Sequence, residues 1–152
     1  MSAANEIPRE THKKTGKGFE DVRINVKMKI SALWVTLMLF YIYADILGFY
    51  SPGVIDKVLL GEIGGVQITE GFLLVMAVWM AVPSVMVVLS LTLKPKANRL
   101  VNIIAGLVSV AVLGATFFAG EFSIRYTFQA AIEGLLMAAI VWNAWKWPKT
   151  DA

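Results

Sequence analysis

The stretch that decides the fold runs from Gly71 to Leu93 and reads GFLLVMAVWMAVPSVMVVLSLTL, without a charged residue. At about 1.5 Å per residue, a helix of this length extends about 35 Å, which is enough to cross a hydrocarbon core of about 30 Å. Pro83 in its interior removes one backbone donor and is expected to kink the helix. The stretch therefore predicts a membrane-spanning helix with a bend.

Three further apolar stretches accompany it, and together they predict an all-α membrane protein, a four-transmembrane-helix bundle over residues 30–147. The predicted spans are 30–50, 69–93, 100–120 and 126–147. Residues 1–29 are polar and basic and are expected to form a flexible cytoplasmic tail, and residues 148–152 a short C-terminus.

Composition excludes several classes of function. Hydrophobic residues make up 57% of the chain and charged residues 16%, against roughly 45–50% and 25% in soluble domains. The chain has no cysteine and one histidine, His12 in the tail, so disulfides, iron–sulfur clusters and His/Cys metal sites are not expected. Zinc-protease, serine-hydrolase and phosphate-loop motifs are missing from the sequence. We therefore expect no metal, no cofactor and no enzyme of those classes.

Lysine and arginine are distributed unevenly between the predicted loops. Twelve of the 14 lie in the tail, in the loop at 94–99 or at the C-terminus, whereas the other two loops hold only Lys57 and Arg125. This distribution predicts that both termini are cytoplasmic and that the basic charge serves membrane orientation rather than nucleic-acid binding. A short interfacial helix is expected around 54–60. The tryptophans expected at the inner interface are Trp34, Trp145 and Trp147.

Two acidic residues lie inside the predicted spans. Asp45 is about five residues from the outer end of the first span, and Glu133 about seven residues below the outer start of the fourth. Both are therefore predicted at the same depth, roughly 8–10 Å beneath the outer interface. A charge at membrane depth costs about 2.5–3.5 kcal/mol on insertion scales, so each acid needs a partner, a cavity or a proton.

Other polar residues are expected around this pair. Tyr41 and Gln129 each precede an acid by four residues and share its helix face, while Glu70 and Arg125 lie at span ends on the same side. Glu70 at a helix start favours a role in stabilising that start over ligand binding. The candidate ligand-binding or proton-binding residues are Asp45, Glu133, Tyr41, Gln129, Glu70 and Arg125.

Two interpretations of these residues remain open. In the first, Asp45 and Glu133 form an outward-facing pocket for a cation, a proton or an amine, and one carboxyl exchanges a proton near neutral pH. In the second, Arg125 neutralises Glu133 while Tyr41 or Tyr43 hydrogen-bonds Asp45, giving a network that only fixes packing. The first is favoured because acids within membrane spans are functional candidates by default.

Several strings in the spans resemble an uncharacterised family of small bacterial four-span membrane proteins, a domain of unknown function. The strings are LWVT at 33–36, YIYAD at 41–45, QIT at 67–69, GF at 71–72, PS at 83–84 and AWKWP at 144–148. The resemblance covers about residues 22–149. It implies the four-span architecture and a bacterial inner membrane, but no activity.

Three functions are compatible with these observations. The first is a binding or accessory protein of the lipid bilayer that uses the acidic pocket. The second is a proton- or cation-coupled transporter, which would need a homo-oligomer because four helices rarely enclose a pathway. The third is a membrane enzyme on a lipid or sterol-like substrate, with Glu133 and Asp45 as general acid and base. In layout the chain is similar to small multidrug exporters and to sterol-isomerase-like proteins, but the exporters carry their essential Glu in the first helix, where this chain has Asp45 nearer the far end.

Overall fold

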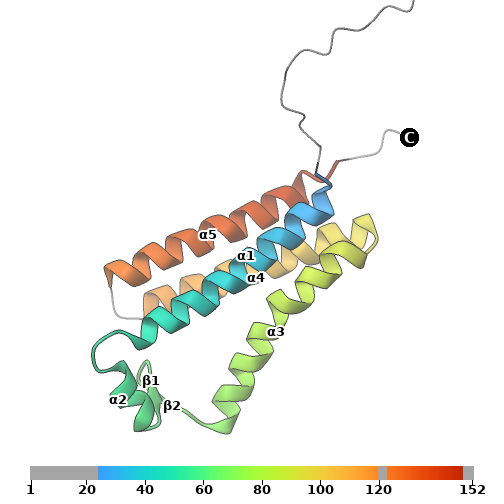
Figure 1. Ribbon diagram of the computed structural model, residues 1–152. Coiled ribbons are helices and arrows are strands. Elements are labelled where there is room, and N and C mark those ends of the chain that lie inside the picture. Colours follow the sequence, from blue (N-terminus) through green and yellow to red (C-terminus); the bar gives the residue numbers. More distant parts are fainter. Residues whose placement is uncertain (1–23, 120–122, 149–152) are drawn as a thin grey trace, which may run out of the picture.

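The computed structural model describes residues 24–119 and 123–148, which are mostly helical (Figure 1). The elements are α1 (Val26–Phe49), α2 (Val54–Leu59), β1 (Glu62–Ile63), β2 (Val66–Gln67), α3 (Glu70–Thr92), α4 (Pro95–Ala119) and α5 (Ile124–Trp145). Helices α1, α3, α4 and α5 are long and apolar enough to cross a membrane, which confirms the predicted set of four long apolar helices. Most of the predicted tail, residues 1–23, lies outside the described residues, as do residues 149–152.

Two of the long helices begin earlier than the apolar spans suggested. Helix α1 begins at Val26, where the Asn25 side chain accepts a hydrogen bond from the Lys27 backbone N–H at 2.9 Å. Helix α4 begins at Pro95, a favourable first position because the missing N–H would have no partner there. Hydropathy locates the apolar part of a helix, whereas the first residues of the helix determine its start. In α1 and α4 the helix begins about one turn before its apolar part.

Helix α1 lies in the middle of the bundle, with α3 on one side and α5 on the other. Helix α4 packs along α5, and α3 meets α4 near the turn that joins them. The start of α1 and the end of α5 lie at one end of the bundle, and α2 lies toward the opposite end (Figure 1).

The buried apolar core of the described chain lies toward the end where α1 begins. Its members are Ile30, Trp34, Leu37, Met86, Met137, Ile140 and Ala144, from α1, α3 and α5. We call this end of the bundle, with the start of α1, the end of α3, the start of α4 and the end of α5, the packed half. Trp34 has no exposed surface, so its ring is a core residue and not an anchor that faces the membrane interface.

Helix α3 bends along its length, and its first part diverges from α1 (Figure 1). Pro83 lies inside the helix and is buried, and proline leaves the carbonyl four residues earlier without its helical donor. The Ser84 hydroxyl donates to the Met80 carbonyl at 3.0 Å, an arrangement that also favours bending. Beyond the bend Leu74 and Val75 are exposed by 65% and 62%. We call the end with the start of α3, the end of α1 and the start of α5 the open half.

Helices α4 and α5 pack closely at Gly106, which is buried. A Cβ atom there would lie 2.6 Å from Cγ2 of Val141, closer than two carbon atoms can approach. The absence of a side chain at this position is what lets the two helices pack this closely.

The segment between α1 and α3 forms a small structure of its own. Helix α2 confirms the predicted short helix and follows Gly53, whose φ of 76° is left-handed. Strands β1 and β2 pair antiparallel through Ile63 and Val66. Gly64 and Gly65 between them have φ of 58° and 78°, as a two-residue hairpin turn with positive φ at both positions requires.

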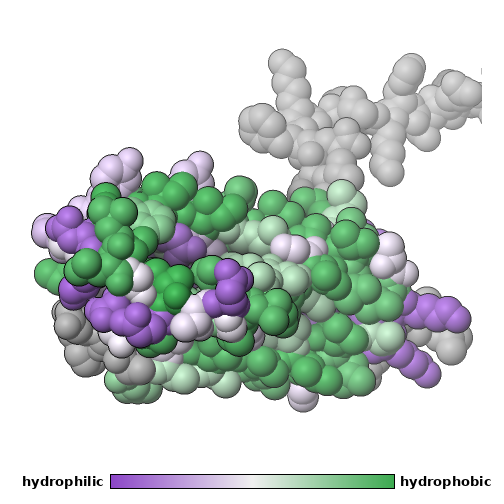
Figure 2. All heavy atoms as spheres, turned by 90° about the horizontal axis from the view of Figure 1, so that it is seen from below, coloured by the Kyte–Doolittle hydropathy of each residue, from purple (hydrophilic) through white to green (hydrophobic). Residues whose placement is uncertain are grey.

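The outer surface is largely apolar. Figure 2 shows hydrophobic residues over most of one face, with hydrophilic residues gathered toward its ends. A soluble protein rarely exposes so extensive an apolar surface, and a lipid-facing bundle requires one.

Candidate functional site

The structure brings Tyr41 and Asp45 of α1 toward Glu133 of α5. Tyr41 and Asp45 lie one turn apart on the same helix, and α1 and α5 pack side by side (Figure 1). Glu133 is within electrostatic range of both the Asp45 carboxyl group and the Tyr41 hydroxyl. Two helices thus contribute acidic groups to one place, which we call the acid pair, Asp45 with Glu133.

The level of the pair along the bundle differs slightly from the predicted one. Glu133 lies about 14 Å from the start of α5 at Ile124, and Tyr41 about 12 Å from the end of α1 at Phe49. Asp45 lies only about 6 Å from that end. Counted from these helix ends, Glu133 thus lies about 8 Å deeper along its helix than Asp45 does.

Arg125 does not neutralise Glu133. Its Nη1 donates to Oε1 of Gln129 at 2.8 Å, along the same face of α5. Over residues 24–119 and 123–148, no Lys or Arg nitrogen pairs with the carboxylate of Asp45 or Glu133, and no Tyr hydroxyl donates to Asp45. The neutral packing network of the second interpretation is thus not formed by the described residues.

Glu70 is not brought to the acid pair. It is the first residue of α3, where Thr69 Oγ1 accepts from the Phe72 N–H at 3.1 Å and caps the helix. The divergence of α3 carries this helix start away from α5 (Figure 1). Glu70 therefore stands where a negative charge favours the positive end of the helix dipole.

A second polar cluster lies in the packed half. Asn102 Oδ1 accepts from Trp34 Nε1 at 2.7 Å and from the Ser90 hydroxyl at 3.1 Å. Asn98 Nδ2 donates to the Ser90 carbonyl at 2.6 Å, and Asn102 Nδ2 to Asn98 Oδ1 at 2.6 Å. All four residues have no exposed surface. The buried polar groups of this cluster are hydrogen-bonded to one another, and the bonds join α1, α3 and α4. We therefore interpret the cluster as structural.

The sequence contained a signal for this cluster. Asn98 and Asn102 are four residues apart and therefore share one face of α4. Asn102 bonds to two other helices, through Trp34 of α1 and Ser90 of α3. Asn143 instead donates to the Ala139 carbonyl of its own helix at 2.7 Å.

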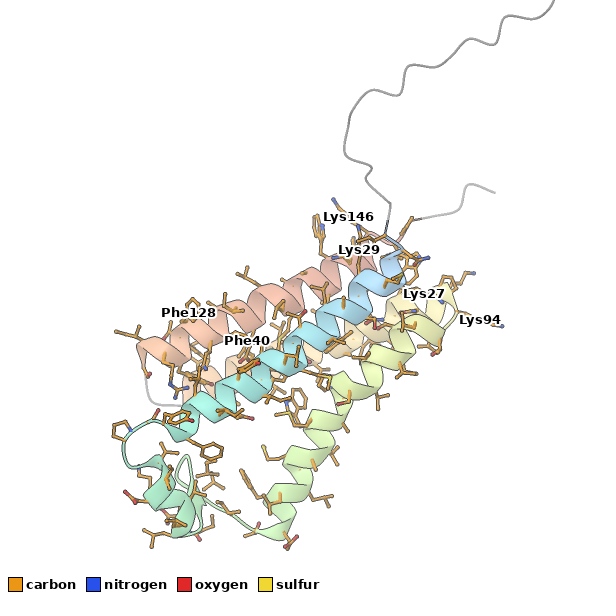
Figure 3. The ribbon with its side chains drawn as sticks, viewed as in Figure 1. Lys27, Lys29, Phe40, Lys94, Phe128 and Lys146 are labelled. Carbon is orange, nitrogen blue, oxygen red and sulfur yellow. The ribbon has the colours of Figure 1, made fainter. Side chains whose placement is uncertain are left out.

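A shallow groove of about 490 Å³ lies along the start of α5, lined by Ser123, Ile124, Thr127, Phe128 and Ala131. Figure 3 labels Phe128 on this helix. Neither acid lines this groove, so it does not provide the acid-capped cavity that the enzyme interpretation requires. Among the described residues, no three His, Asp or Glu side chains gather as metal ligands.

Comparisons with known proteins identify the family. No curated protein and no solved structure matches the chain. The family described as "Family of unknown function (DUF6326)" matches residues 17–152, which include every described element and both residues of the acid pair. The chain, with its four long apolar helices, belongs to this family.

Proposed function

We propose that the protein is a membrane protein that binds a cation or amine at the acid pair. The observation that carries the proposal is that Asp45 and Glu133 lie on the apolar helices α1 and α5, which pack side by side, and have no counter-ion among the described residues. Two like charges at membrane depth repel each other and are costly to hold. A bound proton, metal cation or protonated amine would relieve that cost.

The orientation of the bundle supports an outer-leaflet position for this site, in a bacterial inner membrane with both termini cytoplasmic. Figure 3 labels Lys27, Lys29, Lys94 and Lys146, all at one end of the bundle. In the described chain the opposite end holds only two basic residues, Lys57 and Arg125. Basic residues favour the cytoplasmic side, which puts the acid pair toward the outer side.

Binding of tetraphenylphosphonium, a hydrophobic monovalent cation, tests the proposal on the full chain in detergent micelles. Asp45→Asn and Glu133→Gln should each weaken binding at least about tenfold, since one unit charge a few ångströms away contributes more than about 1 kcal/mol. Asp56→Asn is the matched control, because Asp56 is an exposed acid on α2. The affinities are measured by isothermal titration calorimetry. Equal affinities in the unmodified chain and its three variants would refute the cation site.

A second candidate is cation-coupled transport by an oligomer. Asp45 is exposed on the single chain, and an uncovered carboxylate in a bilayer is costly, which favours a second copy covering it. Flux of a protonated amine into proteoliposomes under a pH gradient tests this candidate. Uptake that survives both Asp45→Asn and Glu133→Gln would exclude it.

A further inference from the structure

A second groove lies at the opposite end of the molecule from the acid pair, where α1 begins and α5 ends. It has a volume of about 270 Å³. Its lining residues are Ile24, Val26, Lys29, Trp142, Asn143, Lys146 and Pro148. Two lysines from two helices therefore face one groove, beside apolar side chains.

The two lysines at the start of α1 have different surroundings. Lys27 Nζ donates to the carbonyls of Leu93 at 2.7 Å and Leu91 at 3.2 Å, at the end of α3. Lys29 is two residues further on, which turns it about 200° around the helix, and it lines the groove on the α5 side. Lys27 thus stabilises helix packing, whereas Lys29 is exposed and has its ammonium group available to a ligand.

The second ammonium group comes from α5. Lys146, the residue that follows the last turn of α5, has its Nζ 4.1 Å from the centroid of the Trp142 ring. This cation–π contact holds the charge against one wall of the groove. Figure 3 shows Lys29 and Lys146 close together at the same end of the bundle.

No described carboxylate offsets this charge. The acids in residues 24–119 and 123–148 are Asp45, Asp56, Glu62, Glu70 and Glu133. All five lie away from the starts and ends of helices that form the groove. An anion placed between Lys29 and Lys146 would therefore meet two positive charges and none of the described negative ones.

We infer that this groove binds the phosphate of an anionic phospholipid. The lysines lie at the first turn of α1 and the end of α5, which is the level of lipid headgroups if the helices span a bilayer. Ile24 and Trp142 beside them are exposed by 57% and 59%, and offer apolar surface for the acyl chains. Free phosphate would contact the lysines alone, so the apolar walls favour a lipid.

Native mass spectrometry of the full chain in detergent, titrated with phosphatidylglycerol, tests this site. The double variant Lys29→Gln/Lys146→Gln should bind the first phosphatidylglycerol at least about tenfold more weakly than the unmodified chain. The charge-retaining pair Lys29→Arg/Lys146→Arg should bind it within about threefold. Phosphatidylcholine, which has no net charge, should bind weakly to all three proteins.

Lys94→Gln/Lys96→Gln is the matched control, because it removes the same charge beside the α3–α4 turn, outside the groove. It should keep full phosphatidylglycerol affinity. The inference is wrong if the control loses as much phosphatidylglycerol affinity as the groove variant, or if phosphatidylcholine binds as tightly as phosphatidylglycerol. It is also wrong if millimolar inorganic phosphate displaces the bound phosphatidylglycerol. The site uses neither Asp45 nor Glu133, so its test is independent of the cation site.

Discussion

The packed half and the open half use the same kind of apolar helix but are held together differently. In the packed half, Trp34, Ser90 and Asn102 bond three helices around a buried core. In the open half α3 leaves α1 (Figure 1), and Asp45 and Glu133 lie on the neighbouring helices α1 and α5 without a described counter-ion. Because lipid is as apolar as leucine, helices in a bilayer associate through close packing and polar bonds. The half that lacks those bonds is the half in which we propose the cation site.

The largest expected effect is on the polar cluster. Asn102→Ala removes the acceptor of the buried Trp34 Nε1–H and Ser90 hydroxyl groups, and each unsatisfied buried donor costs about 1–3 kcal/mol. The free energy of unfolding, measured by SDS titration in mixed micelles, should fall by about 3 kcal/mol. Asn143→Ala is the control, because Asn143 bonds only within its own helix among the described residues. Equal losses in both variants would show that the cluster does not hold the packed half together.

A smaller effect is expected where α4 and α5 approach each other. Gly106→Val would place new atoms inside the Val141 side chain, and such overpacking costs about 2 kcal/mol. Gly114→Val, two turns further along α4, is the control, since no atom lies within 4 Å of a Cβ built there. The midpoint of thermal unfolding, followed by circular dichroism, should fall for Gly106→Val and stay near that of the unmodified chain for Gly114→Val.

The helix caps offer the same chemistry in both halves. Asn25 caps α1 in the packed half and Thr69 caps α3 in the open half, and alanine at a cap costs about 1 kcal/mol. Asn25→Ala should lower the unfolding midpoint, because the start of α1 is tied to the core. Thr69→Ala should leave the midpoint unchanged and instead speed hydrogen exchange of the Phe72 amide, through fraying of the first turn. If the two variants had equal unfolding midpoints, the start of α1 would be no more firmly tied to the core than the start of α3.

Much of this architecture could be predicted from the sequence. A long stretch without charge, as at 71–93, predicts a helix long and apolar enough to cross a membrane, and the structure has such a helix there. Proline at position 83 indicates its bend. Positions four residues apart predict shared faces, which the structure confirms for the hydrogen bond between Arg125 and Gln129. These features depend only on neighbours along the chain.

The rest depends on the rotation and order of the helices, which the spacing of residues does not give. Depth along a helix can be counted, and this placed Asp45 and Glu133 toward the same end of the bundle. Whether Trp34 faces lipid or the core depends on how α1 is turned toward Asn102, 68 residues away. The sequence correctly predicts that Glu70 begins its helix. The divergence of α3, which the sequence does not give, keeps Glu70 away from the acid pair.

The smallest effect on stability is expected at the acid pair itself. If Asp45 and Glu133 fixed packing, the double variant Asp45→Asn/Glu133→Gln would unfold at a lower temperature. No described ion pair or hydrogen bond holds either acid, and removing a charge at membrane depth relieves a cost, so the free energy of unfolding should stay the same or rise by up to about 1 kcal/mol. Gln129→Ala on the same helix is the contrasting variant, because Gln129 is only 6% exposed and bonds Arg125, and it should lower stability. A double variant that keeps its stability but loses tetraphenylphosphonium binding would show that the two acids of the open half serve cation binding rather than packing.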